Sequence, residues 1–215
     1  MLENQSAGTI QVPRTADELR RHVRSRLSLA PGDVHGDHVY NPGARDWVLN
    51  RSLKPAAVLI GLLERQASLN VLLTKRLDSL RTHSGQVAFP GGRVDPTDES
   101  VEFAALREAW EEVALDPASA EILGRLPDYC TGSGYRIAPV LALIDPNSPL
   151  AANPLEVDYF FEVPLAFLMD PHNHHRASRL LEGKERFFFE MPYGDHYIWG
   201  VTAGILKLMH ERLIA

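Results

Sequence analysis

The chain has 215 residues and a formal net charge of -6 at pH 7, with 45% hydrophobic and 23% charged residues. This composition is typical of a soluble globular protein with enough apolar material for a core, and it excludes a disordered chain. Because the net charge is negative, no global positive field attracts nucleic acid, and we expect no nucleic-acid partner.

Three features of the sequence bear on the compartment and on membranes. Cys130 is the single cysteine, so it cannot form an internal disulfide, which fits a reducing compartment. The start, "MLENQSAGTI", lacks the basic and apolar regions of a signal peptide. The longest apolar stretches are about half of the roughly 20 residues that a membrane helix needs. We therefore expect a cytoplasmic protein with no membrane partner.

The first quarter of the chain predicts a helix and a connection. Thr15 and Glu18 form a capping-box pattern that opens the helix "ADELRRHVRSRLSL". Residues 31–54 are rich in Pro, Gly, Asn and Asp, which favours a long connection. We assign residues 1–54 to this helix and connection, packing on a domain formed by residues 55–215. Apolar residues of the connection could serve a homodimer.

The rest of the chain predicts a mixed sheet. Residues 57–63 and 70–76 are apolar runs that favour a strand pair, and "QVAFPGG" favours a short extended piece. The aromatic triplets 159–161 and 187–189 are expected in buried strands. Strands are also predicted, from β-branched and aromatic residues, in "AEILGRLPDY", "YRIAPVLALI", "VDYFFEVPL" and "RFFFEMPYGDHYIWG". "TAGILKLMHERLI" predicts a final helix. This order, without regular βαβ alternation, indicates a mixed sheet with helices on its faces.

Residues 99–114 have helical periodicity, and their large apolar side chains repeat at helical spacing. This pattern predicts an apolar stripe that faces the core. The stripe consists of Phe103, Leu106, Trp110 and Val113.

Three glutamates lie on another side of the same helix. Glu108, Glu111 and Glu112 fall within an arc of roughly 100°, and like charges at these spacings cost a few tenths of a kcal/mol each. One interpretation is a solvated face. The other is a divalent metal site, because Mg²⁺ and Mn²⁺ are usually held by carboxylates together with substrate phosphates. Gly91 and Gly92, just upstream, would let the backbone approach a ligand closely.

At this point the helix resembles the box of the Nudix hydrolase family: a glycine, five residues, a glutamate, seven residues, and R-E-U-x-E-E-x-G-U, with U bulky and aliphatic. Glu99, seven intervening residues and "REAWEEVAL" match it. The resemblance implies an α/β/α sandwich and hydrolysis of a nucleoside diphosphate linked to another moiety. It implies Mg²⁺ or Mn²⁺ as the metal. The implied catalytic residues and metal ligands are Arg107, Glu108, Glu111 and Glu112, with Glu99 as a further metal ligand.

The chain departs from the box in three places. Six residues instead of five separate Gly92 from Glu99, so Asp98 could stand in register in place of Glu99. Ala109 is small where a larger aliphatic residue is usual. Ala114 replaces the glycine that favours a left-handed helix end.

The segment before the box concentrates positive charge in Lys75, Arg76, Arg81 and His83. These residues could be solvated charges, or they could form a phosphate-binding rim opposite the glutamates. Leu72–Gly92 resembles the signature of the coenzyme A pyrophosphatase branch, L-L-T-x-R through F-P-G-G.

That resemblance implies cleavage of coenzyme A (CoA) or acyl-CoA into 3′,5′-ADP and 4′-phosphopantetheine or its acyl form. A basic residue should recognise the 3′-phosphate of this small-molecule substrate, and Arg76, Arg81 and His83 are the candidates. The general base is Glu108 or Glu112. Two alternatives remain: a generic pyrophosphatase for ADP-ribose, NADH or dinucleotides, and a non-catalytic Nudix-fold binding module. The intact glutamates argue against the binding module.

Overall fold

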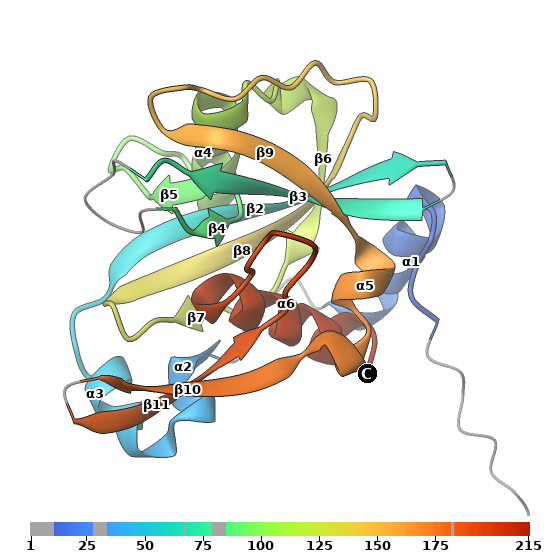
Figure 1. Ribbon diagram of the computed structural model, residues 1–215. Coiled ribbons are helices and arrows are strands. Elements are labelled where there is room, and N and C mark those ends of the chain that lie inside the picture. Colours follow the sequence, from blue (N-terminus) through green and yellow to red (C-terminus); the bar gives the residue numbers. More distant parts are fainter. Residues whose placement is uncertain (1–10, 28–33, 67, 79–84, 182) are drawn as a thin grey trace, which may run out of the picture.

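The computed structural model describes residues 11–27, 34–66, 68–78, 85–181 and 183–215 (Figure 1). Within these residues, the larger sheet has nine strands. They are β1 (His35–Gly36), β2 (Lys54–Arg65), β3 (Ser68–Arg76), β4 (Val87–Ala88), β5 (Gly91–Arg93), β6 (Ala120–Arg125), β7 (Tyr129–Cys130), β8 (Tyr135–Ile144) and β9 (Val157–Pro164). A separate hairpin consists of β10 (His175–Leu181) and β11 (Lys184–Glu190).

The sequence predicted three of the helices: the N-terminal helix, the helix that carries the glutamates, and the final helix. The α-helices are α1 (Ala16–Arg26), α2 (Asp37–Tyr40), α3 (Arg45–Leu49), α4 (Val101–Val113), α5 (Leu165–Leu168) and α6 (Gly200–Leu213). Short 3₁₀ turns lie at Pro42–Ala44, Pro117–Ser119 and Pro171–Asn173. In the described part of the chain, no helix combines the length and the apolar character that crossing a membrane requires.

The sheet is mixed, as the order of elements predicted. Its main path runs β1-β7-β8-β2-β3-β4, while β5, β6 and β9 pair with β2, β8 and β3. The pairs β2–β8 and β1–β7 are parallel, and the other pairs are antiparallel.

Both faces of the sheet are covered, because strand side chains alternate between faces. On β2, Ile60 and Leu62 pack into the core beside α1, α5 and α6. Leu59 and Leu63 pack into the core beside α4. Figure 1 shows α4 and α6 on opposite sides of the sheet. The α/β/α sandwich with an N-terminal helix is therefore confirmed.

The N-terminal segment packs into the same core. Thr15 caps α1 as predicted, and its hydroxyl accepts a hydrogen bond from the Glu18 N–H at 3.3 Å. Leu19 and Val23 are buried against the sheet and α6. The predicted connection 31–54 is more regular than expected, since it contains β1, α2 and α3 where it is described.

The predicted apolar stripe of α4 is wrong for its two aromatic residues, whereas Val113 is buried as predicted and Leu106 is half-buried against the core. Phe103 and Trp110 are 49% and 54% exposed. The helix instead packs on the sheet through small residues, which let the two backbones approach closely. These buried residues are Ala104, Ala105, Ala109 and Val113.

The aromatic triplets are also less buried than predicted. Tyr159 is 38% exposed, and Phe160, Phe161 and residues 187–189 are half-buried. The reason is their place in the sheets, since among the described residues β9 pairs with β3 alone and the β10–β11 sheet has two strands.

Enlarging a buried alanine of α4 tests this packing. We expect Ala109→Leu to lower the free energy of unfolding by about 1–3 kcal/mol, because the helix must move off the sheet. Phe103→Ala, the matched control on the exposed side, should change it by less than about 1 kcal/mol. Urea unfolding followed by circular dichroism measures both values. A larger loss for Phe103→Ala than for Ala109→Leu would contradict the packing.

Candidate active site

Both ends of α4 are held by side chains. Ser100 caps the N-terminus, and its hydroxyl accepts a hydrogen bond from the Phe103 N–H at 3.1 Å. At the other end, Ala114 adopts the left-handed conformation with φ 54°, where glycine is the usual residue. Asn153 donates from its side chain to the Glu111 carbonyl at 3.1 Å and from its N–H to the Glu112 carbonyl at 2.9 Å. These contacts fix the last turn, which carries two of the three glutamates.

Arg107 is the centre of a charged network on α4. Its guanidinium donates to both carboxylate oxygens of Asp98, at 3.0 and 3.1 Å. One of its nitrogens also donates to Glu108 and Glu111, at 3.0 Å each. The bonds to Asp98 are the first cause of the raised pKa of Arg107. A planar fork bonded to three carboxylates fixes their relative positions.

The structure places Asp98, not Glu99, beside Arg107. The Asp98 side chain is only 2% exposed, and the hydrogen bond from Arg107 lowers the pKa of its carboxyl. Glu99 is exposed and forms no hydrogen bond or ion pair with the described residues. The extra residue after Gly92 therefore turns Glu99 outwards, and the structure gives no support to Glu99 as a metal ligand.

Glu112 is a buried carboxylate with one unused oxygen. Its side chain is 1% exposed, and its Oε1 accepts a hydrogen bond from Arg76 Nη1 at 2.8 Å. Its Oε2 is buried and has no hydrogen-bond partner among the described residues, although the nearby Gly91 N–H lowers the pKa of the carboxyl. Burial raises the pKa of Glu112 to about 7, against the opposing effect of Arg76 and with a further rise from the charge of Glu108.

Glu108 lies directly against Gly92, the second glycine of the pair. Its side chain is 14% exposed, and burial raises the pKa of its carboxyl while Arg107 opposes the rise. A Cβ atom on Gly92 would stand 2.5 Å from Glu108 Oε2, so only glycine leaves room for the carboxylate. At Gly91, a Cβ atom would stand 2.5 Å from the carbonyl oxygen of Ala57 on β2.

The other predicted site residues are less constrained. The Glu111 side chain is 45% exposed at the rim of the network. Arg81 and His83 lie outside the described residues. Within the described ranges, no three carboxylates or imidazoles converge closely enough to form a ready-made metal cluster. Arg107 is instead bonded to Glu108 and Glu111, and Arg76 is bonded to Glu112.

The sequence interpretation missed a fourth carboxylate, Glu156. Its carbonyl accepts a hydrogen bond from the Leu77 N–H at 3.3 Å, and the next residue, Val157, pairs with Arg76. The negative charge of Glu156 contributes to the raised pKa of both Glu108 and Glu112. Glu156 lies in the segment "NPLEVDYFFEVPL", but no periodicity connects it to α4, so sequence spacing gave no signal.

These residues fit a divalent cation. The donors are all carboxylate oxygens, which Mg²⁺ and Mn²⁺ prefer. The buried Glu112 Oε2 has no partner among the described residues, and a buried oxygen of this kind favours occupation by a cation. The Glu108 carboxylate lies in the space that the missing side chain of Gly92 leaves open. Glu108, Glu111 and Glu112 would hold the metal, with Glu156 close by.

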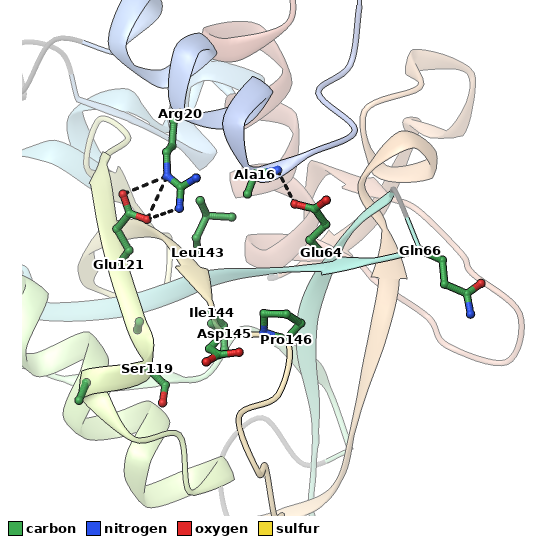
Figure 2. Close-up of a pocket in the computed structure, with 12 residues that line it drawn as sticks. Ala16, Arg20, Glu64, Gln66, Ser119, Glu121, Leu143, Ile144, Asp145 and Pro146 are labelled. Atoms are coloured by element: carbon green, nitrogen blue, oxygen red, sulfur yellow. Dashed lines mark hydrogen bonds and ion pairs between the residues drawn. The ribbon is translucent and has the colours of Figure 1, made fainter.

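A cavity of about 620 Å³ lies elsewhere, at the junction of α1, β6 and the far end of β2 (Figure 2). Two of its charged residues are paired with each other, since Arg20 lies 2.6 Å from Glu121, and Glu64 accepts a backbone hydrogen bond from α1. Glu64 lies roughly 23 Å along β2 from Ala57, which pairs with Gly92. This cavity is therefore not part of the glutamate site.

Comparisons with known proteins identify the family. Residues 53–180 match the NUDIX domain family, and the chain belongs to the Nudix hydrolases. A relative from Escherichia coli (strain IAI39), described as "Uncharacterized Nudix hydrolase NudL", is 43% identical over 72% of this chain and 80% of its own length. A NudL relative from Escherichia fergusonii is 44% identical over the same shares.

Solved structures of this family resemble the chain more distantly. The NUDIX domain of Shewanella oneidensis NrtR, solved with ADP ribose, has a TM-score of 0.49 at 19% identity, covering 76% of this chain and 90% of that chain. A MutT/nudix family protein from Enterococcus faecalis has a TM-score of 0.48 at 17% identity, covering 92% and 74%. Nudix hydrolases generally use divalent metal ions such as Mg²⁺.

Alanine substitutions at the glycine pair separate metal binding from folding. We expect Gly92→Ala to weaken Mn²⁺ binding by roughly tenfold or more, because the added methyl group displaces the Glu108 carboxylate. Its free energy of unfolding should change by less than about 1 kcal/mol, since a flexible side chain can move. Gly91→Ala should lose at least about 2 kcal/mol, because its methyl group meets the β2 backbone.

Gly43→Ala is the matched control, since a Cβ atom there would meet no atom of the described residues within 4 Å. Free Mn²⁺ measured by electron paramagnetic resonance gives the affinity, and urea unfolding gives the stability. If Gly92→Ala bound Mn²⁺ with native affinity, the claim that Gly92 leaves room for a metal-binding Glu108 carboxylate would be wrong.

The raised pKa of Glu112 predicts a pH-dependent stability in metal-free protein. Between the ordinary pKa of 4.5 and about 7, folded Glu112 holds a proton that the unfolded chain releases. The free energy of unfolding therefore falls as the pH rises through this interval, by up to roughly 3 kcal/mol. Glu112→Gln should remove this part of the decline, as urea unfolding at pH 5 and pH 8 with EDTA would show. If the free energy of unfolding declined equally in wild-type protein and in Glu112→Gln, the raised pKa of Glu112 would not be its cause.

Proposed function

We propose that this Nudix hydrolase cleaves the diphosphate of CoA or acyl-CoA, releasing 3′,5′-ADP and 4′-phosphopantetheine or its acyl form. One observation carries the proposal: the segment resembling the CoA branch, Leu72–Gly92, borders the glutamates of α4 at two points. Arg76 lies 2.8 Å from Glu112, and Gly92 lies against Glu108. The resemblance therefore concerns residues that contact the candidate catalytic groups.

The proposed reaction is a hydrolysis. The oxygen of a water molecule bonds to one phosphorus, and the bond from that phosphorus to the bridging oxygen breaks. The water proton passes to Glu108 or Glu112, the two carboxylates on α4 whose pKa is raised by burial. A bound Mg²⁺ or Mn²⁺ supplies charge stabilisation to the phosphoryl oxygens and acidifies water.

The arginines have distinct roles in this proposal. Arg107 positions Glu108 and Glu111 through hydrogen bonds of 3.0 Å each. Arg76 compensates the buried charge of Glu112, so it is a positioning residue. Arg81 and His83 remain proposed contacts of the substrate phosphates, in the segment that precedes the glycine pair. Gly91 and Gly92 would bring the backbone close to the same phosphates.

Glu156 is the proposed additional carboxylate of the metal site. Its backbone is held between Leu77 and Asn153, at the end of β3 that also supplies Arg76. This position brings it near Glu108 and Glu112, which is why its charge affects the pKa of both.

A substrate panel tests the proposal. CoA, acetyl-CoA, dephospho-CoA, ADP-ribose and NADH are each incubated with Mg²⁺ or Mn²⁺, and the products are identified by mass spectrometry. We expect 3′,5′-ADP from CoA and much slower cleavage of ADP-ribose and NADH. Equal rates for all five substrates would favour the generic pyrophosphatase, and no cleavage would favour the binding module.

Two substitutions serve as controls for the panel. Glu108→Gln should lower kcat on CoA by at least about 1000-fold, because it removes a charge from the metal site and a proton acceptor. Glu99→Gln should retain activity within about threefold, because an exposed side chain with no described partner contributes little. Equal losses in the two variants would contradict the placement of Glu99 outside the site.

A further inference from the structure

The last two residues of β3 lie where the register between β3 and β9 shifts, and their contacts place them on opposite faces of the sheet. Arg76 faces α4 and is bonded to Glu112 at 2.8 Å. This contact engages Arg76 with the catalytic carboxylates and makes it a poor candidate for recognising a second phosphate. Lys75, on the other face, is the remaining basic residue of this strand end.

Lys75 is held in place without filling its hydrogen-bonding capacity. Its Nζ lies 3.8 Å from a carboxylate oxygen of Asp78 and 3.8 Å from one of Asp158. Both distances are ion pairs that are too long for hydrogen bonds, and the described residues give Lys75 no side-chain hydrogen bond. An ammonium group has three N–H donors, so Lys75 can still donate to a ligand.

A cluster of three rings lies beside Lys75. Tyr159 is the cross-strand partner of Lys75, and the Lys75 Nζ lies 5.8 Å from the centre of its ring. His196 stacks on Phe161 with ring centres 3.7 Å apart and planes 12° apart. The Tyr159 hydroxyl lies 3.3 Å from His196 Nδ1.

The cluster joins two distant segments and leaves one ring accessible. His196 belongs to the loop between β11 and α6, where its backbone exchanges two hydrogen bonds of 2.9 Å with Tyr193. Tyr159 remains 38% exposed, although an aromatic ring usually contributes most when buried. Anchored rings with an accessible surface, next to a cation, suit a flat aromatic group that carries negative charge.

We propose that Lys75 and Tyr159 bind the 3′-phosphoadenosine part of the substrate, with Lys75 on the 3′-phosphate and Tyr159 against the adenine. This inference rests on the proposed function, because CoA carries a phosphate on the same ribose as its adenine. The pantetheine arm has neither a ring nor a charge to match this surface. His196 and Phe161 are positioning residues that hold Tyr159.

The first test compares two substrates that differ only in the 3′-phosphate. We expect Lys75→Met to lower kcat/KM for CoA by roughly 10- to 100-fold, because it removes a hydrogen bond to a charged group. The value for dephospho-CoA should change by less than about threefold, and Lys75→Arg should keep most of the preference for CoA, since it keeps the charge. Lys184→Met, at an exposed lysine of the β10–β11 hairpin, is the matched control.

The second test measures binding without catalysis. In EDTA, isothermal titration calorimetry compares 3′,5′-ADP with 5′-AMP on the full-length protein. Wild-type protein should bind 3′,5′-ADP at least about tenfold more tightly, a preference that Lys75→Met abolishes. Tyr159→Leu should weaken binding of both nucleotides by a similar factor, because stacking on adenine does not depend on the 3′-phosphate.

The outcomes separate this inference from the proposed function. If wild-type protein prefers CoA over dephospho-CoA and Lys75→Met keeps the same preference, the role of Lys75 is wrong while the proposed function stands. If kcat/KM falls equally for both substrates, Lys75 is structural and the inference is also wrong. If wild-type protein does not cleave CoA at all, the proposed function fails, and the calorimetry then decides whether Lys75 binds a 3′-phosphate.

Discussion

The buried contact between Glu112 and Arg76 is the constraint on which the site depends. A carboxylate that is 1% exposed loses hydration worth several kcal/mol, and a single arginine contact offsets only part of that loss. Its second oxygen remains unpartnered in the described structure. Such an arrangement is costly for folding alone, and a cation at this position would relieve it. The cost is tolerated because the sandwich fixes both partners, one on α4 and one on β3.

Alanines make this contact possible. Ala105 and Ala109 are fully buried and allow α4 to approach the sheet, so that Glu112 on the same helix reaches Arg76 at the end of β3. A larger residue at position 109 would hold the helix further away. The small residue that departs from the family pattern is therefore consistent with the close packing of this helix.

The sequence predicted the elements of the site better than their orientation. Periodicity located α4 to within two residues at its start, and the box pattern identified Arg107 and the three glutamates. Hydrophobicity ranks side chains by type, so it selected Phe103 and Trp110 as buried when alanines actually face the sheet. The spacing of the box gave two candidates for its upstream acidic residue, Asp98 and Glu99. Only the contacts of Arg107, which are with Asp98, distinguish them. Glu156 could not be found by spacing, because strand pairing brings it to α4.

The end of β3 carries two neighbouring basic residues: Arg76 contacts the candidate catalytic glutamates, and Lys75 lies in the proposed nucleotide-binding surface. Lys75 contacts Tyr159 and Arg76 contacts Glu112, on opposite faces of the sheet, although the register between β3 and β9 shifts at this point. Arg76 is next to the glutamates, where a positive charge compensates a buried carboxylate. Lys75 is next to the accessible ring of Tyr159 and has N–H donors that the described residues do not use. A ligand that reaches both faces would pass the edge of the sheet near β4, which pairs with this part of β3. In the proposed function, neighbouring residues of one strand would recognise the position of the diphosphate and the identity of the attached group, so a change in one need not disturb the other.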